Sequence, residues 1–176
     1  MAQTARLEGK VAIVTGAARG QGEAEARLFV AEGASVVLTD VLADDVGAVA
    51  ASLGDRAVAL AHDVVDDAAW GRVVDEATTR FGGVDVLVNN AAIHWIRPLL
   101  EEKADDIRRI VDVNLIGPVL GMQAVAPAMQ ARGGGAIVNI SSLAGQSGFW
   151  GHGAYGSTKW GLRGLSRVAA VELLIN

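Results

Sequence analysis

Three residues towards the carboxyl-terminal end of the chain have the types and spacing needed for proton transfer. Tyr155 and Lys159 stand four apart, so a helix places both side chains on one face. Ser142 comes thirteen residues before Tyr155, in the apolar run I-V-N-I-S-S. No Asp, Glu, Lys or Arg lies between Arg132 and Lys159, so a lone ammonium acts on the phenol in otherwise neutral surroundings. The pattern indicates a phenol that works as an acid or a base. The alternative is a half-exposed ring beside a lysine that reaches to solvent.

A glycine-rich turn near the other end of the chain predicts a phosphate-binding loop. The β-branched run V-A-I-V-T precedes G-A-A-R-G-Q-G, and a helix is expected from Glu23 to Glu32. A strand, a glycine turn and a helix N-terminus together cradle a phosphate. In this interpretation Gly16 permits the turn, Gly20 permits close approach of the backbone, and Gly22 permits close packing of the helix on the strand.

An acid ends the second expected strand. The run S-V-V-L-T leads to Asp40, whose carboxylate is placed to accept hydrogen bonds from a ribose diol and would repel a 2′-phosphate. The residue favours NAD over NADP for this reason. Asp40 is also a candidate N-cap for a helix beginning in V-L-A-D-D, and the two roles are compatible.

The full set of motifs resembles the short-chain dehydrogenase/reductase family in its compact bacterial form. The resemblance runs from Leu7 to about Leu173, and the part from Gly135 onwards is most similar to bacterial hydroxysteroid and secondary-alcohol dehydrogenases. It implies one domain, residues 1–176, with a Rossmann-like doubly wound parallel sheet flanked by helices, an α/β fold. The residues that carry it are T15-G-A-A-R-G-Q-G22, N89-N-A-A92, Asn114, Ser142, Tyr155 and Lys159.

The resemblance also implies an active site for an NAD-dependent oxidoreductase that interconverts a secondary alcohol and a ketone. Tyr155 is expected to exchange a proton with the reacting oxygen, and Ser142 to orient that oxygen. Lys159 is expected to bind the nicotinamide ribose and to assist the phenol, while Asn114 holds a water. The expected coenzyme-binding residues are Gly16, Arg19, Gly20, Gln21, Gly22, Asp40, Asp63, Val64, Asn90, Ala91, Tyr155 and Lys159. Two positions depart from the family pattern, Gln21 and Ala92.

A proline gives a separate reason to consider Asn114. Pro118 has no N–H, so it cannot donate to the Asn114 carbonyl four residues earlier, in a helix expected from about Glu101 to Met129. The freed carbonyl needs a partner, and water is the available one. With the resemblance, this water joins a proton path through Lys159 to Tyr155. The alternative is a packing kink with a buried Asn.

Two further strands complete the expected sheet on either side of a helix. R-A-V-A-L-A is the third strand, and by the resemblance Asp63 after it accepts from the adenine amino group, although a helix cap is the other interpretation. Asp66 is the better capping candidate. V-D-V-L-V-N-N is the fourth strand and is typical of a strand buried on both faces. The helix between them has an inner stripe of Trp70, Val73, Val74 and Ala77.

Composition narrows the function classes. The chain has 176 residues, a net charge of −5 and no cysteine. The charge argues against nucleic acid or an anionic membrane as partner, and the lack of cysteine excludes disulfides and thiolate chemistry. The three histidines have no metal-ligand spacing, so no metal is expected. The first residues lack a signal-peptide core and no stretch predicts a membrane span, so a cytoplasmic protein is expected.

Five residues flank the expected catalytic strand ends: His94, Trp95, Phe149, Trp150 and His152. They either line a pocket for a bulky apolar alcohol or ketone or pack the loops, and the sequence favours neither. In the resembling family the chain continues for about another third, with two more strands and a substrate lid, whereas this sequence stops at V-E-L-L-I-N. A dinucleotide-binding module with little turnover is therefore the alternative function.

The apolar residues of two helices favour self-association. By the resemblance, these helices pair across a two-fold axis and give a dimer or tetramer. The residues expected at that surface are Leu115, Val119, Met122 and Val125 on the first helix, with Leu162, Leu165, Val168, Ala169 and Leu173 on the second.

Overall fold

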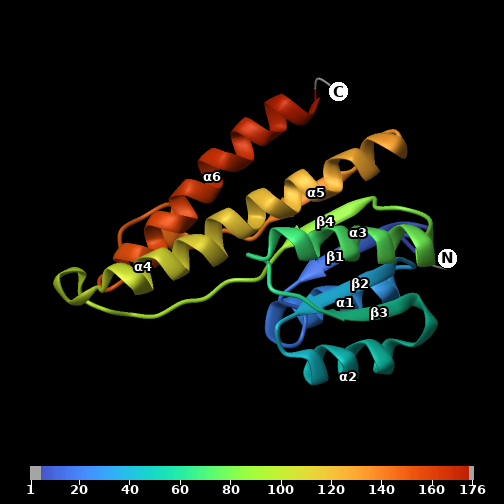
Figure 1. Ribbon diagram of the computed structural model, residues 1–176, viewed down its shortest axis with the longest axis horizontal. Coiled ribbons are helices and arrows are strands. Elements are labelled where there is room, and N and C mark those ends of the chain that lie inside the picture. Colours follow the sequence, from blue (N-terminus) through green and yellow to red (C-terminus); the bar gives the residue numbers. More distant parts are fainter. Residues whose placement is uncertain (1–4, 175–176) are drawn as a thin grey trace.

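The computed structural model describes residues 5–174, which form a five-stranded parallel sheet with helices on both faces (Figure 1). Its order is β3-β2-β1-β4-β5. The chain winds outwards from β1 in one direction and from β4 in the other, so the switch point lies between these two strands. This confirms the predicted α/β fold. The strands are β1 (Val11–Thr15), β2 (Ser35–Asp40), β3 (Ala57–Ala61), β4 (Val86–Asn89) and β5 (Ala136–Asn139).

Six α-helices connect and flank the strands. They are α1 (Gly20–Ala31), α2 (Ala43–Leu53), α3 (Asp67–Phe81), α4 (Ala104–Val111), α5 (Gly117–Ala131) and α6 (Gly153–Leu174). Short 3₁₀ turns span Gly54–Arg56, Leu99–Glu101 and Leu143–Gly145, and a π-helical turn, Asp112–Ile116, joins α4 to α5.

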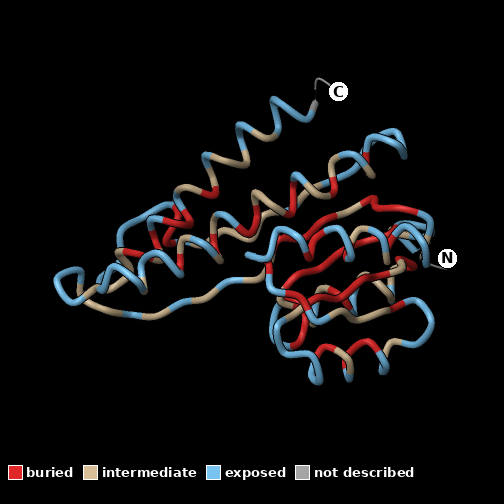
Figure 2. The backbone as a smooth tube through the Cα atoms, in the orientation of Figure 1, coloured by how far each residue is buried: buried red, intermediate tan, exposed pale blue. Residues whose placement is uncertain are grey.

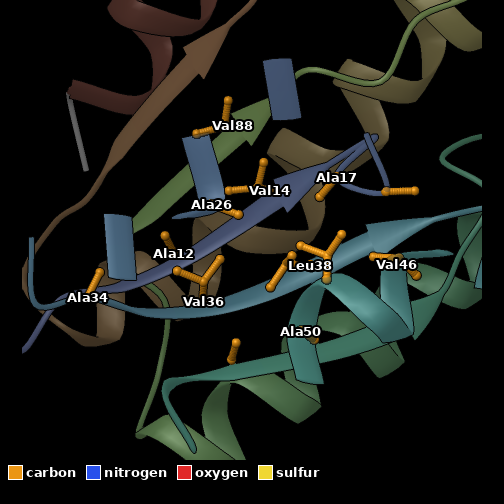
Figure 3. Packing of buried hydrophobic residues seen from close by; sticks show 13 residues of the cluster. Ala12, Val14, Ala17, Ala26, Ala34, Val36, Leu38, Val46, Ala50 and Val88 are labelled. Carbon is orange, nitrogen blue, oxygen red and sulfur yellow. The ribbon is translucent and has the colours of Figure 1, made fainter. Parts of the chain in front are cut away.

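The sheet has a separate hydrophobic core on each face because successive strand residues point to opposite sides. Ala12 and Val14 of β1 pack towards α1 and α2, as Figure 3 shows, together with Leu38 of β2. Their neighbours Val11 and Ile13 belong to the second core. That core contains, from α3 and α5, Trp70, Val73, Ala77, Val125 and Met129.

The helix predicted from Glu101 to Met129 is wrong in two respects. It begins at Ala104, and the π-helical turn interrupts it. Within that turn Gly117 N–H donates to the Asp112 carbonyl, five residues earlier. The missing N–H of Pro118 is thus accommodated at the start of α5, the position where a helix tolerates proline.

Several smaller predictions are resolved by the structure. Asp66 is the N-cap of α3 and accepts from Ala69 N–H at 3.2 Å, as expected. The predicted stripe of α3 is confirmed at Trp70, Val73 and Ala77, which are buried, while Val74 is partly buried. Helix α1 begins at Gly20 rather than Glu23.

The second half of α6 extends away from the sheet, beyond α5 (Figure 1), and its residues are mostly exposed (Figure 2). Val168 is 53% and Val171 62% exposed, which is unusual for apolar side chains on a long helix. The predicted apolar surface needs correction, because Met122, Val125 and Leu162 are buried within this chain. The remaining residues of that prediction are exposed or partly exposed.

The helical stretch Ala104–Ala131 is long and apolar enough, by length and composition, to cross a membrane. Its apolar side chains have a place in the protein itself, because Met122, Val125 and Met129 are buried and Val125 and Met129 pack in the core beside α3. In the described residues, 39% of the apolar window of this stretch is buried.

Candidate active site and coenzyme cleft

A cleft of about 670 Å³ lies at the carboxyl edge of the sheet. Loops that follow β1, β2, β3 and β4 form one side of it, and α4 with the start of the π-helical turn forms the other. This is where ligands bind in open α/β sheets. Seven of the predicted coenzyme-binding residues line it: Gly16, Arg19, Asp40, Asp63, Val64, Asn90 and Ala91.

The glycine turn between β1 and α1 has the geometry of an anion cradle. Gly16 and Gly20 have φ angles of +65° and +62°, which glycine adopts without strain. A side chain at Gly22 would collide with the Gly16 carbonyl and the Asn90 amide, whereas a Cβ at Gly20 would meet nothing within 4 Å. The N-cap of α1, Arg19, makes no side-chain capping bond, so no capping side chain from Arg19 occupies the first N–H groups of the helix. These residues fit a coenzyme pyrophosphate.

Asn90 holds the glycine turn in place. Its Nδ2 donates to the Thr15 carbonyl at 2.9 Å and to the Gly16 carbonyl at 3.1 Å. The Thr15 hydroxyl in turn accepts from the N–H groups of Asn90 and Ala91, at 3.1 and 3.0 Å. These bonds join the ends of β1 and β4 at the switch point. They give Asn90 a structural task that the sequence did not reveal.

Asp40 is fixed at the end of β2 by two backbone donors. Its Oδ2 accepts from Ala18 N–H at 3.0 Å, and its Oδ1 accepts from Leu42 N–H at 3.1 Å. Leu42, not Asp40, is the N-cap of α2, so the capping interpretation is wrong in its strict form. The carboxylate instead ties the glycine turn to β2 and faces the cleft.

The segment after β3 contributes one expected and one unexpected residue. Asp63 is exposed in the cleft and accepts from Val65 N–H at 3.2 Å. His62 is buried, with Nδ1 3.3 Å from the Thr39 hydroxyl, and Nε2 has no partner within residues 5–174. Burial lowers the pKa of His62, so a neutral ring is expected. In the sequence, only its position next to Asp63 could have indicated that His62 belongs to the cleft.

Tyr155 and Lys159 lie on one face of α6, as their spacing predicts. The Lys159 Nζ stands 5.7 Å from the centre of the Tyr155 ring and donates to the Ile140 carbonyl at 2.7 Å. Lys159 is only 3% exposed, and burial lowers its pKa to about 8. The Lys159 side chain therefore lies in a water-poor site beside the Tyr155 ring.

The two serines after β5 have different partners. Ser142 caps the 3₁₀ turn Leu143–Gly145, with its Oγ accepting from Ala144 N–H at 3.1 Å, and it is half-buried. Ser141 Oγ donates to the Lys159 carbonyl at 3.4 Å, which anchors it to α6. Since the capping bond uses Ser142 only as an acceptor, its hydroxyl proton remains available for donation.

Asn114 is buried in the π-helical turn and links it to a distant loop. Its Oδ1 accepts from Ile93 N–H at 2.8 Å, and its Nδ2 donates to the Ile93 carbonyl at 2.9 Å. The Nδ2 also lies 3.3 Å from the Thr158 hydroxyl, next to Lys159 in sequence. The side chain thus braces the loop after β4 against α6.

Two histidines from separate loops lie against the Tyr155 ring. The His94 ring lies edge to face against Tyr155, with 4.5 Å between centroids, and the His152 ring lies 6.1 Å from Tyr155. Trp95 has a different partner, since its Nε1 donates to the Glu102 carboxylate at 3.2 Å. Phe149 and Trp150 remain 49% and 77% exposed beside this cluster.

The predicted site residues form two groups in the structure. The cleft collects the residues expected at the adenosine end, whereas Ser142, Tyr155 and Lys159 lie outside its lining, around the end of β5 and the start of α6. Gln21 belongs to neither group, since its amide donates to Glu25 along α1 at 2.8 Å. Gly20 and Gly22 support the cleft through the shape of the turn.

The order of the strands, the glycine turn after β1 and the cleft at the carboxyl edge of the sheet together define a Rossmann-like α/β domain. A sequence profile described as short chain dehydrogenase matches residues 10–175. The chain therefore belongs to the short-chain dehydrogenase family, as its motifs indicated.

Curated relatives agree with this membership. The chain is 46% identical over 168 residues to a 3-alpha-(or 20-beta)-hydroxysteroid dehydrogenase of Mycobacterium bovis, covering 96% of this chain and 65% of that protein. It is 42% identical to a sorbitol dehydrogenase of Cereibacter sphaeroides (96% and 66%) and 40% identical to a meso-2,3-butanediol dehydrogenase of Serratia marcescens (95% and 66%). The chain thus spans about two thirds of the length of the relatives it matches.

Proposed function

We propose that this chain is the coenzyme-binding and catalytic part of an NAD-dependent oxidoreductase that interconverts a secondary alcohol and a ketone. The observation that carries the proposal is the buried Lys159 ammonium beside the Tyr155 ring, within family membership that implies NAD or NADP as coenzyme. The three relatives described above are named for alcohol substrates, steroid or polyol. A panel of secondary alcohols with NAD, followed by the absorbance of NADH, tests it.

Each catalytic residue has a distinct task in this proposal. Tyr155 takes the proton from the alcohol oxygen in oxidation and returns it in reduction. Ser142 donates its remaining hydroxyl proton to that oxygen, and Lys159 supplies a positive charge beside the phenol during proton transfer. Asn114 keeps the loop after β4 and the helix of Lys159 in register, and a water on its carbonyl would complete a proton path to solvent. When bound, the nicotinamide supplies or accepts the hydride.

The apolar part of the substrate is proposed to rest on Phe149 and Trp150. Both rings are exposed, and Phe149 lies 5.9 Å from His152, which in turn borders Tyr155. An exposed pair of large rings next to a reactive group is suited to a bulky alcohol or ketone. The protein is proposed to act in the cytoplasm.

Coenzyme choice gives the first prediction. Isothermal titration is expected to show tighter binding of NAD than of NADP, because Asp40 accepts from a ribose diol and repels a 2′-phosphate. Asp40→Asn should narrow the difference without tightening NAD binding, since it removes the charge while its one amide oxygen can still accept from either Ala18 N–H or Leu42 N–H. Equal affinity of the wild-type protein for both coenzymes would contradict the assignment. Arg19, which also lines the cleft, is a cation able to favour NADP.

Self-association gives the second prediction. The exposed apolar residues of α6, with Ile116 at 42% exposure beside α5, are expected to pair with a second copy of the chain. Light scattering at micromolar concentration should give the mass of a dimer or a tetramer. Val168→Glu with Val171→Glu should shift that mass towards the monomer, and a monomeric wild-type protein would count against the proposal.

A dinucleotide-binding module with little turnover is the second candidate. The observation that favours this candidate is that the predicted site residues form two separate groups. The cleft is lined by residues predicted to bind the coenzyme, but not by Ser142, Tyr155 or Lys159. NAD binding without oxidation of any alcohol in the panel would select this candidate.

A further inference from the structure

Backbone contacts between two loops bring His94 and His152 together. The loop after β4 and the loop before α6 meet where Arg97 N–H donates to the Gly151 carbonyl at 2.9 Å, beside a parallel β-bridge between Arg97 and His152. Gly151 has a φ of +72°, and a side chain there would collide with Ile96 and Arg97. The imidazoles then lie 5.1 Å apart, centroid to centroid, and both border the Tyr155 ring.

The hydrogen-bonding state of His152 follows from its partner. Its Nδ1 lies 2.9 Å from the Trp150 carbonyl, which can only accept, so Nδ1 carries the proton. In the neutral ring Nε2 is then a hydrogen-bond acceptor. Within residues 5–174 this atom has no hydrogen-bond partner, and neither does either ring nitrogen of His94. The pair therefore offers unused acceptors and a donor beside the phenol.

The surroundings of His94 oppose its protonation. Burial, followed by the charge of His152, lowers the pKa of His94. Lys159 lies behind the Tyr155 ring as a further cation. Arg97 pairs with Asp106 and lies 3.6 Å from Glu102, and Glu102 also accepts from Trp95, so these acids are engaged with other partners. Imidazole side chains carry both donors and acceptors, and a hydroxyl group, which also does both, matches such a pair better than a carboxylate, which only accepts.

From this geometry we infer that His94 and His152 bind a second hydroxyl of the substrate, next to the carbinol that reacts at Tyr155. The substrate class is then a vicinal diol, or the hydroxyketone formed from it. The inference rests on the proposed alcohol oxidation and specifies its substrate. Both histidines act by positioning and recognition, while proton transfer stays with Tyr155.

The kinetic test compares cyclohexanol with its vicinal diol, which share a carbon skeleton. The wild-type protein should prefer the diol in kcat/KM. His94→Phe and His152→Phe keep a ring against Tyr155 but remove the nitrogens, so each should lower the diol-to-alcohol ratio by about tenfold, chiefly through KM for the diol. His152→Gln restores an acceptor and should recover most of the ratio. Trp95→Phe, in the same loop, is the matched control and should leave the ratio unchanged.

A second measurement does not depend on turnover. The chain has three histidines, so their ring protons can be assigned by NMR from single substitutions. In the complex with NADH, saturating diol should shift the His94 and His152 signals, with His62 as the internal reference, and cyclohexanol should shift them less. A ratio unchanged in both Phe variants, or equal shifts with the two ligands, overturns the inference. Failure of every alcohol to react defeats the proposed function, while the NMR result still decides the role of the pair.

Discussion

Replacing Tyr155 by Phe is expected to lower kcat for alcohol oxidation by about a hundred- to ten-thousand-fold, the range typical of general acid–base catalysis. The substitution removes the phenolic oxygen and its proton but keeps the ring that packs against His94, 4.5 Å away. The site should therefore keep its shape. The dissociation constant of NADH, measured by fluorescence titration, should change by no more than about threefold, because only the proton-transfer step is lost.

The Lys159→Ala variant is expected to behave differently from the Tyr155→Phe variant. Lys159 is buried and bonds to the Ile140 carbonyl, and it is proposed to serve both the coenzyme and the phenol, so its loss should weaken NADH binding and turnover together. The ammonium charge should also matter less as the pH rises through about 8, where this buried lysine loses its proton. A Tyr155→Phe variant of unchanged structure that keeps about a tenth or more of wild-type turnover would show that the phenol is not the proton carrier.

The order and type of the strands could be predicted because local patterns agree with the fold. The run V-A-I-V-T is apolar at nearly every position, since β1 is central and buried on both faces, and the structure confirms all five residues as buried. The Tyr155–Lys159 spacing fixes a shared face of α6 by helical geometry alone. Such features depend on residues close in sequence, which is why the sequence was sufficient for them.

Features that depend on distant contacts could not be predicted. The π-helical turn around Asn114 is accompanied by hydrogen bonds to Ile93 and by Pro118 in the first turn of α5. The residue pattern from Glu101 to Met129 does not indicate this turn. The burial of Val125 depends on where α5 lies relative to α3. Likewise, His94 and His152 meet only because Arg97 and Gly151 join their loops.

At the edge of the sheet opposite the cleft, the buried Asp85 carboxylate joins three elements. The sequence pattern indicated only that this residue belongs to a strand. Asp85 Oδ2 accepts from Val11 N–H at 2.9 Å, and Arg132 donates to both carboxylate oxygens, at 3.1 and 3.0 Å. Lys10 lies 3.7 Å away, and the residue is 8% exposed. One side chain thus joins the start of β1, the start of β4 and the end of α5.

Asp85→Ala is therefore expected to lower the free energy of unfolding by about 3–5 kcal/mol, because it leaves the Arg132 charge and a backbone donor without their partner. Urea unfolding followed by circular dichroism measures this. The control is Asp105→Asn, which breaks an ion pair with Arg108 whose acid is 96% exposed, and it should cost less than about 0.5 kcal/mol. A loss at Asp85 no larger than the loss at Asp105 would show that the buried network contributes little.

The same carboxylate should make stability depend on pH. Burial opposes ionisation of Asp85, but the Val11 N–H and the Arg132 guanidinium outweigh it and hold the pKa below its usual value. A group whose pKa is lowered by folding stabilises the protein above its unfolded pKa, about 3.9 for Asp, and this contribution is lost as the pH falls through the folded value. The difference in unfolding free energy between wild type and Asp85→Asn should thus be constant near neutral pH and shrink below about pH 4. A difference that persists unchanged into acid would mean that folding does not lower the pKa of this carboxyl.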